Sequence, residues 1–295
     1  MPPLLDPTRL ARYGQLALTA HQLVEGFLTG VHKSPYKGYS VEFAEHRQYY
    51  PGDEIRHIDW RAVAKTDRYY IKEYEEETNL KAHLLVDASG SMAYRGKHPS
   101  KFQHAQHIAA ALAYLLLHQR DAVGLMLHDS RFRQVIKPRS HSKHLLQILQ
   151  ALEAARPGGE TALADLWHQT AEQLRQRGLV IVLSDCFGEV STLYRALQHL
   201  HHRRHEVLLF HILAPEELEF PFTRWTQFRN LEIQGDQQLV DPQQLRKDYL
   251  ANFQRYLNEL REACGKTQVD YHLIRTDQPV ERALGIYLAR RAGRR

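Results

Sequence analysis

The stretch LLVDASGSM, Leu84 to Met92, decides the fold of this 295-residue chain. An apolar run ends there in Asp87, and Ser89 and Ser91 follow at alternate positions. Runs that are apolar throughout are typical of strands buried on both faces, as in parallel sheets covered by helices. Ligands of open α/β sheets collect outside the carboxyl ends of such strands. The stretch therefore predicts a buried parallel strand with a polar site at its end.

The sequence around this stretch alternates between strand and helix patterns from Leu80 onward, which indicates a mostly parallel, Rossmann-type sheet covered on both faces. Only Asp129 and Ser130 separate the second and third strands, too few residues for a crossover, so these strands form a hairpin with one antiparallel strand at the sheet edge. We expect six strands in the order 3-2-1-4-5-6. The predicted strands are 80–87, 122–129, 131–138, 178–185, 206–213 and 269–275, and the predicted helices are 101–119, 144–154, 162–177, 192–202, 242–264 and 280–290.

The first part of the chain differs from the rest in its residue pattern and composition. Apolar residues recur at helical spacing over residues 7–27, and Gly30 follows where a helix would stop. Residues 34–79 are aromatic and charged, with turn signals that indicate short strands and few aliphatic side chains. We therefore expect an N-terminal helix and β-rich extension over residues 1–77, packed against an α/β domain over residues 78–295.

Composition limits the class of protein. The chain is 43% hydrophobic, and its 39 Lys and Arg against 34 Asp and Glu give a formal charge of +5, without a block of one sign. This mild charge does not indicate nucleic acid binding. The two cysteines fit no disulfide framework or metal-ligand spacing, and no uncharged apolar run is long enough to span a bilayer. We expect a cytoplasmic protein without a transmembrane segment.

Five oxygen-bearing side chains are expected to meet at the strand ends. They are Asp87, Ser89, Ser91, Thr161 in the loop RPGGET, and Asp185 at the end of LVIVLSD. Carboxylate and hydroxyl oxygens without a required thiolate or imidazole suit Mg²⁺, or Mn²⁺. A lone Asp-x-Ser-x-Ser also fits a helix N-cap or an Asx-turn, so the prediction of a metal depends on the whole set.

These residues resemble a known family. DASGSM, Thr161 in GGET and Asp185 in LSDC look like the metal-ion-dependent adhesion site of von Willebrand factor A domains. The upstream stretch YKGYSVEFAEHRQYYPGDEIRHIDWRAVAKTDRYYIKEYEEETNL, residues 36–80, resembles the bacterial domain-of-unknown-function family numbered 58. The resemblance is strong over about residues 34–190. It implies a von Willebrand A-like α/β domain.

The resemblance also implies how the site works. Ser89, Ser91 and Thr161 would hold the metal directly, while Asp87 and Asp185 would act largely through bound water. Neutral hydroxyls leave the cation electrophilic, so an Asp or Glu from a protein partner can fill its open position. Proteins of this family are commonly encoded near MoxR-type AAA+ ATPases and other von Willebrand A proteins, which implies an adaptor or assembly factor rather than an enzyme.

The rival interpretation is a metal-dependent hydrolase or phosphatase at the same strand end. A strand that ends in Asp could carry the nucleophile of a haloacid-dehalogenase-like phosphatase, but Ser89 stands where the second Asp is normally found. Neither a G-x-S-x-G elbow around the serines nor a phosphate-binding P-loop is present. These departures favour protein binding over catalysis.

Four further features have two interpretations each. Asp53, Arg56, Asp59 and Trp60 form either a partner surface or a charge-paired network that holds the extension. HLHHRRH, residues 199–205, is a zinc or nucleic-acid site or, as we favour, the cationic end of a helix. KEYEEET, residues 72–78, is a solvated strand face or an acidic patch for a partner. Cys186 is redox-active or simply a small buried side chain.

Overall fold

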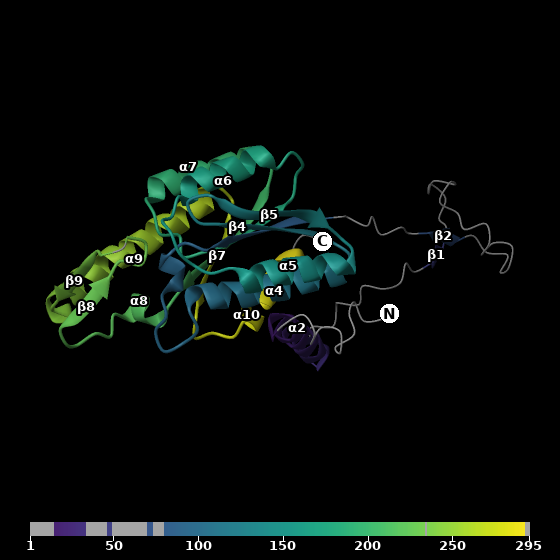
Figure 1. Ribbon diagram of the computed structural model, residues 1–295. Coiled ribbons are helices and arrows are strands. Elements are labelled where there is room, and N and C mark those ends of the chain that lie inside the picture. The colour runs from purple at the N-terminus through teal and green to yellow at the C-terminus, as the bar shows by residue number, and fades with distance from the viewer. Residues whose placement is uncertain (1–14, 34–45, 49–69, 73–79, 234, 293–295) are drawn as a thin grey trace. The chain divides into compact units, whose positions relative to one another are not determined.

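The computed structural model describes residues 15–33, 46–48, 70–72, 80–233 and 235–292, and of these the side chains of 15–28, 80–233 and 235–291 (Figure 1). The chain divides into two compact units, one of residues 1–28 with 80–295 and one of residues 29–79. In the second unit, β1 (His46–Gln48) and β2 (Tyr70–Lys72) pair antiparallel. The predicted boundary between residues 77 and 78 stays a prediction.

The first unit is built on one six-stranded sheet in the order β10-β7-β6-β3-β4-β5. Its strands are β3 (Lys81–Asp87), β4 (Ala122–His128), β5 (Phe132–Arg139), β6 (Leu179–Ser184), β7 (Glu206–Leu213) and β10 (Asp270–Arg275). All neighbours are parallel except β4 and β5, which form the edge hairpin. When these six strands are numbered 1 to 6 in chain order and the sheet is followed from β5 to β10, the order is 3-2-1-4-5-6, as predicted. The α/β fold with one antiparallel edge strand is confirmed.

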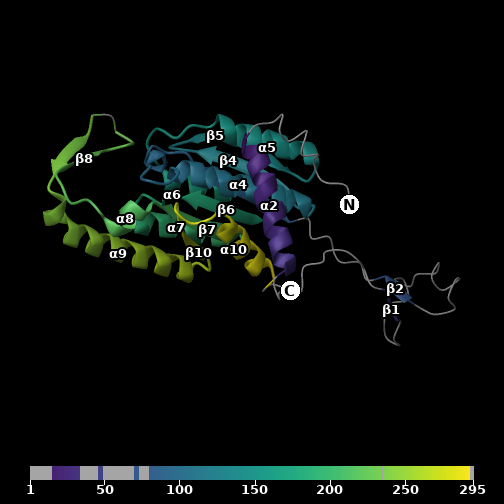
Figure 2. The same ribbon diagram turned by 90° about the horizontal axis from the view of Figure 1, so that it is seen from below.

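Helices cover both faces of this sheet (Figures 1 and 2). One face carries α4 (Lys101–His118), α5 (Ser142–Ala154) and α10 (Glu281–Ala292), and α2 (Gln15–Lys33) lies outside them. The other face carries α6 (Leu163–Gln173), α7 (Val190–His202) and α9 (Pro242–Lys266). The amphipathic helix predicted at the N-terminus is α2, which buries Leu16, Ala20 and Val24 in the core. The predicted stop at Gly30 is wrong, because α2 continues to Lys33.

The alternation of side chains along β3 explains why both faces need cover. Leu84 and Val86 belong to the core shared with α2, α4, α5 and α10, whereas Leu85 belongs to the core shared with α6, α7 and α9. Successive strand residues point to opposite faces, so an apolar run with no polar member must be buried on both sides. All three side chains are fully buried. This burial holds the carboxyl end of β3 at the centre of the sheet.

Three elements between β7 and α9 are absent from the sequence prediction. α8 (Pro215–Glu219) follows β7, and β8 (Thr226–Arg229) and β9 (Gln237–Val240) form a hairpin that lies beside α9 (Figure 1). β8 and β9 have four residues each and do not join the main sheet. Short polar strands give little periodic signal, which is why the pattern did not reveal them.

Within the described ranges, the helices are all too short or too polar to cross a bilayer. The basic cluster at residues 199–205 closes α7, where His199, His201 and His202 lie in the last turn. This is the cationic helix end that the sequence favoured, since positive side chains complement the helix dipole there.

Candidate functional site at the ends of β3 and β6

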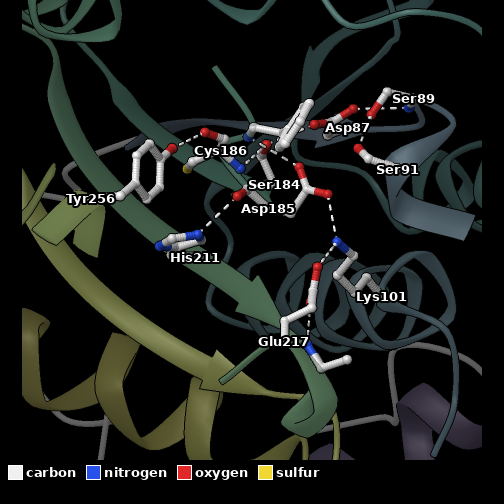
Figure 3. A network of polar contacts seen from close by, with 12 residues as sticks. Asp87, Ser89, Ser91, Lys101, Ser184, Asp185, Cys186, His211, Glu217 and Tyr256 are labelled. Carbon is white, nitrogen blue, oxygen red and sulfur yellow. Dashed lines mark hydrogen bonds and ion pairs between the residues drawn. The ribbon is translucent and has the colours of Figure 1, made fainter. Parts of the chain in front are cut away.

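The site lies where the chain changes its winding direction. The chain runs from β3 to β4 and β5 on one side, and then returns to place β6 on the other side of β3. β3 and β6 are parallel neighbours, so Asp87 and Ser184, the last residues of each, end at the same edge of the sheet (Figure 3). Ligand sites of open α/β sheets form at such a switch point.

Asp87 is fully buried and already makes two hydrogen bonds. Ser89 N donates to its Oδ1 at 2.9 Å, and Ser184 Oγ donates to its Oδ2 at 2.6 Å. Burial, and then the charge of Asp185, raise the pKa of Asp87 to about 7, although the bonds from Ser184 and Ser89 lower it. A cation beside this carboxylate would favour its ionised form.

The two serines of the loop face each other. Ser89 Oγ and Ser91 Oγ are 3.1 Å apart, and Ser91 also reaches the carboxylate of Asp185, where its hydrogen bond lowers the pKa of that group. Ser91 opens the short 3-10 helix η3 (Ser91–Ala93), which turns the chain toward α4. The alternate spacing of the serines thus brings both hydroxyls to the carboxylate pair, as the sequence predicted.

Backbone hydrogen bonds join the loop of Thr161 to the loop of Asp87. Gly158 N donates to Ala88 O at 2.9 Å, and Gly90 N donates to Gly159 O at 2.8 Å. Gly159 has φ +81°, a backbone conformation that favours glycine and lets the two loops approach each other. Thr161 Oγ1 is buried and has no hydrogen-bond partner in the part of the chain that the structure describes.

Lys101 enters the site from the first turn of α4 (Figure 3). Its Nζ donates to Asp185 Oδ2 and to Glu217 Oε1, both at 2.7 Å, and the side chain is 3% exposed. Burial by itself would lower the pKa of Lys101, but the two carboxylates raise it above its usual range. Burial would likewise raise the pKa of Asp185, but Lys101 and the hydrogen bonds lower it. Asp185 is therefore ionised.

The position of Lys101 follows from the cap of α4. Ser100 accepts a bond from Gln103 N, and Gln103 accepts one from Ser100 N, so a reciprocal capping box fixes the start of the helix. Glu217 is fixed in turn by α8, where its Oε2 accepts a bond from Ala214 N at 2.7 Å. The ammonium is thus held between two elements that lie far apart in the sequence.

The turn after Asp185 is also tightly held. Cys186 has φ +53°, and its carbonyl accepts a hydrogen bond from the hydroxyl of Tyr256 on α9. Burial lowers the pKa of His211 to about 4, so this imidazole is neutral. His211 Nε2 donates to Asp185 O at 2.8 Å, which leaves Nδ1 to accept from Tyr271. Burial raises the pKa of the Cys186 thiol, which fits a small buried side chain rather than a reactive one.

The loop between β8 and β9 supplies one more carboxylate, that of Glu232. Thr161 N donates to Glu232 Oε2 at 3.2 Å, and a hydrogen bond from Ser91 lowers the pKa of Glu232, whereas burial raises it. The pKa of Glu232 lies above its usual value as a result, and the charges of Asp185 and Asp87 add to the rise. Glu232 thus contacts two of the predicted site residues.

A family description matches this chain over residues 45–258, and it reads "Protein of unknown function DUF58". The match covers most of the chain and includes the whole site. The chain belongs to the DUF58 family.

Other proteins resemble this DUF58 chain to different degrees. An uncharacterized protein of Mycobacterium tuberculosis (strain ATCC 25618 / H37Rv) is 28% identical over 219 residues, which are 73% of this chain and 68% of that protein. The magnesium-chelatase 67 kDa subunit of Chlorobaculum parvum (strain DSM 263 / NCIMB 8327) is 30% identical over 125 residues, which are 41% of this chain and 19% of that subunit.

Solved structures with a similar fold include the conserved hypothetical protein BatB from Bacteroides thetaiotaomicron, with a TM-score of 0.50, 16% identity and coverage of 72% of this chain and 99% of that one. The SpRpn10 VWA domain has a TM-score of 0.36 and 18% identity, and the match covers 45% of this chain and 75% of that domain. With its six-stranded sheet and single antiparallel edge strand, the DUF58 chain has a von Willebrand A-like fold.

A pocket of about 450 Å³ adjoins the site of this DUF58 protein. Its polar lining includes Ser91, Lys101 and Asp185 of the site, together with the acidic residues Glu216, Glu217, Glu232 and Asp236. Its apolar wall consists of aromatic side chains from the segment before β8, from β8 and from α9, namely Phe220, Phe222, Phe228, Tyr249, Phe253 and Tyr256. Phe187 also lines it and is 65% exposed.

The structure gathers Asp87, Ser89, Ser91, Thr161 and Asp185 into one cluster of loops, but their role as metal ligands stays a prediction. In the described residues no group of three or more His, Cys, Asp or Glu is arranged to hold a metal ion, so any metal here depends on the hydroxyls. The predicted partner surface of Asp53, Arg56, Asp59 and Trp60, and most of the acidic run at 72–78, lie outside the described residues.

Four residues of the site, Lys101, Ser184, Glu217 and Glu232, were not predicted from the sequence. Ser184 interrupts an apolar run just before Asp185, which is a usable signal. The other three come from elements whose contact with the site depends on the tertiary fold. In particular, Glu232 belongs to the hairpin that the sequence pattern missed.

Proposed function

We propose that this chain is a metal-dependent protein–protein interaction module. Ser89, Ser91 and Thr161 would hold Mg²⁺, or Mn²⁺, directly, and Asp87 and Asp185 would act largely through bound water. When bound, the ion would supply an electrophilic position that an acidic side chain of a protein partner can fill. The residues of the chain would orient the ion and exclude bulk water from it.

One observation carries this proposal: a buried hydroxyl without a partner stands in a cluster of buried carboxylates. Thr161 Oγ1 is buried and no hydrogen bond to it is found among the described residues. Buried polar groups are nearly always paired, and an unpaired one calls for an explanation such as a missing ion. Asp87 is fully buried beside ionised Asp185, and no ion pair to it is found among the residues that the structure describes. A divalent cation would satisfy all of these groups.

The donor set fits Mg²⁺ better than it fits softer metals. Its atoms are hydroxyl and carboxylate oxygens, which hard cations prefer, and both cysteines are buried thiols rather than ligands of the loop cluster. Hydroxyl ligands add no negative charge, so they would not neutralise the ion. Much of its positive charge would then be left to attract a carboxylate of a partner. The aromatic pocket beside Asp185 would add apolar contact around the acidic group of that partner.

The proposal extends to the cellular role. The similarity to a protein named as a magnesium-chelatase subunit supports a place in an assembly, because a subunit acts with other chains. We propose an adaptor or assembly factor that works in the cytoplasm with a MoxR-type AAA+ ATPase and other von Willebrand A proteins. The acidic side chain that fills the metal position would belong to one of them.

The test is capture of a purified MoxR-type AAA+ ATPase from the same source by the immobilised full-length chain. We expect capture with Mg²⁺, loss of capture with EDTA, and loss with Asp87→Ala in the presence of Mg²⁺. Asp248→Ala, which removes an exposed carboxylate on α9, is the matched control and should capture normally. Metal-dependent hydrolysis of p-nitrophenyl phosphate that disappears in Asp87→Ala would instead support the phosphatase interpretation.

A further inference from the structure

The loop between β8 and β9 presents its side chains in an unusual order. Leu231 and Ile233 are 46% and 53% exposed, whereas Glu232 between them is turned inward and its Oε1 is buried. Carboxylates normally remain in water and aliphatic side chains avoid it. A loop that exposes two aliphatic side chains and half-buries the acid between them, with one carboxyl oxygen fully buried, therefore needs a reason for this arrangement.

Asn230 fixes the shape of this loop. Its Oδ1 accepts bonds from Glu232 N at 3.0 Å and from Ile233 N at 3.2 Å, an Asx-turn arrangement that directs the chain inward. Asn230 N donates to Asp236 O at 2.8 Å, and its Nδ2 donates to Asp236 Oδ2 at 3.0 Å, so the loop is closed across its base. The inward position of Glu232 is thus built into the hairpin.

The carboxylate of Glu232 meets the predicted metal ligands with one oxygen and leaves the other unpaired. Oε2 accepts a hydrogen bond from Thr161 N at 3.2 Å, and the Ser91 hydroxyl, which Asp185 also attracts, lies near the same carboxyl group. Oε1 has no hydrogen-bond partner within the described ranges, and neither does the neighbouring hydroxyl of Thr161. Two unpaired buried oxygens, one of them on a carboxyl group, on residues that contact each other indicate a missing cation more strongly than either does alone.

The backbone of the loop lies directly against the Asp87 loop. A Cβ on Gly90 would stand 2.2 Å from Leu231 O and 3.1 Å from Glu232 Cα. Gly90 has φ −60°, which any residue adopts, so the glycine is required there by the close approach and not by its own conformation. The contact is therefore specific to this placement of the hairpin tip.

We propose that Glu232 is an internal ligand of the metal site, and that its carboxylate takes the position which the acidic side chain of a partner would take. The proposal rests on the proposed function. It makes the β8–β9 loop a cover that a partner must displace. It also defines the partner's motif by analogy with the loop itself: an acidic residue with aliphatic neighbours, Leu-Glu-Ile in this chain.

A structural role alone does not account for the carboxylate. Thr161 N and the Ser91 hydroxyl need only a neutral acceptor, which an amide would supply without adding charge. Glu232 instead adds a third carboxylate near Asp87 and Asp185, and their charges disfavour its ionised form. The ammonium of Lys101 is already shared between Asp185 and Glu217. An anionic side chain is useful at this position when a divalent cation is bound.

The test counts the water molecules bound to Mn²⁺ by water-proton relaxation, and measures the affinity for Mn²⁺ by calorimetry, in the full-length chain. Glu232→Ala should gain about one inner-sphere water per Mn²⁺ and bind the ion about tenfold more weakly. Glu160→Ala, which removes an exposed carboxylate next to Thr161, is the matched control and should leave the water count unchanged. An unchanged water count and affinity in Glu232→Ala would overturn the inference.

A second pair of variants tests the cover without changing any carboxylate. Gly90→Ala should push the hairpin tip away and give the same gain of bound water as Glu232→Ala. Gly158→Ala is its matched control, because a Cβ at Gly158 would meet nothing within 4 Å. A Gly90→Ala protein that retains the wild-type water count would contradict the cover.

The outcomes separate this inference from the proposed function. If the wild type binds Mn²⁺, Asp87→Ala does not, and Glu232→Ala matches the wild type, then the metal site stands and only the internal ligand is wrong. If the wild type binds no Mn²⁺ at all, then the proposed function falls and the internal ligand falls with it.

Discussion

Lys101 Nζ lies 2.7 Å from Asp185 Oδ2, and these side chains are only 3% and 2% exposed. A buried ammonium thus stands at the edge of the sheet where the sequence predicts a metal. It keeps Asp185 ionised, whereas Asp87, whose pKa is raised, has no ion pair in the part of the chain that the structure describes. The two carboxylates at this edge therefore differ: Asp185 is paired with a buried cation and Asp87 is paired with hydrogen-bond donors alone.

The first prediction concerns this ion pair. Lys101→Met would leave Asp185 and Glu217 buried without their shared cation, and removal of one partner of a buried pair typically costs about 3–5 kcal/mol. We expect a loss of that size in the free energy of unfolding, measured with urea. Lys97→Met, at an exposed position of the preceding loop, should change it by less than about 0.5 kcal/mol. If Lys101→Met lowered the free energy of unfolding by no more than Lys97→Met does, then the ion pair would not stabilise the fold.

The same pair offers an internal check. The double variant Lys101→Met with Asp185→Asn removes both charges, so it should recover part of the stability that the single variant loses. No recovery would mean that Glu217, or the packing of the lysine stem, accounts for the effect of Lys101.

Much of the fold was predictable because its information is local. The run at Leu84 to Val86 is apolar on both faces, and the three residues between β4 and β5 permit only a hairpin. These features predicted a buried parallel strand and an antiparallel edge hairpin without any knowledge of packing, and the strand order followed from the pattern of Rossmann-type sheets. The five oxygen-bearing residues were predictable too, because the carboxyl ends of parallel strands meet at one edge and Asp87 and Asp185 mark two of those ends.

The rest of the site depends on distant contacts. The sequence shows Lys101 as an ordinary first residue of a helix, and its burial is explained by two distant contacts, with Asp185 after β6 and with Glu217 on α8. Glu232 lies in a polar stretch whose strands of four residues show no clear period. Its role follows from the path of a hairpin that folds back over the site, which no spacing in the sequence encodes.

The second prediction uses the unpaired hydroxyl of Thr161. Thr161→Val keeps the shape of the side chain but removes a buried hydroxyl that has no partner among the described residues, so in EDTA the variant should be as stable as the wild type or slightly more stable. With Mg²⁺ at a hundredfold excess over its Kd, the wild type should gain about 2.7 kcal/mol and the variant little of it. Thermal unfolding in the two buffers measures both effects.

The matched control for Thr161 is Thr223→Val, at an exposed position before β8, which should respond to Mg²⁺ as the wild type does. If Thr161→Val destabilises the protein equally in EDTA and in Mg²⁺, then the hydroxyl has a structural role and is not a metal ligand.

The third prediction concerns the edge hairpin of the sheet. A Cβ on Gly124 in β4 would stand 2.7 Å from Ile136 O and 3.0 Å from Pro138 Cδ, where the register of β4 and β5 shifts. Gly124→Ala should force the strands apart and lower the free energy of unfolding by about 1–3 kcal/mol. Gly158→Ala, with open space around its Cβ, should be close to neutral. Faster amide hydrogen exchange in β5 would locate the damage, whereas equal stability of the two variants would refute the steric argument.

The fourth prediction is a pH dependence from His104 on α4. Burial first, and then the charge of His107, lower the pKa of His104 from 6.5 to about 4, against a smaller opposite effect of Asp277. Between pH 6.5 and pH 4, His104 is therefore protonated in the unfolded chain and neutral in the folded chain. The free energy of unfolding therefore falls as the pH drops from 6.5 to 4, by about 1 kcal/mol per pH unit for this residue.

An amide at this position removes the titration but stays polar. His104→Gln should therefore reduce the slope of unfolding free energy against pH, over the window from 6.5 to 4, by the equivalent of about one proton. His202→Gln, at the exposed end of α7, is the matched control, and its slope should stay that of the wild type. Urea titrations at half-unit steps of pH in EDTA give the slope without any contribution from a metal. Equal slopes for the wild type and His104→Gln would mean that the imidazole accepts its proton in the folded state, which its 3% exposure argues against.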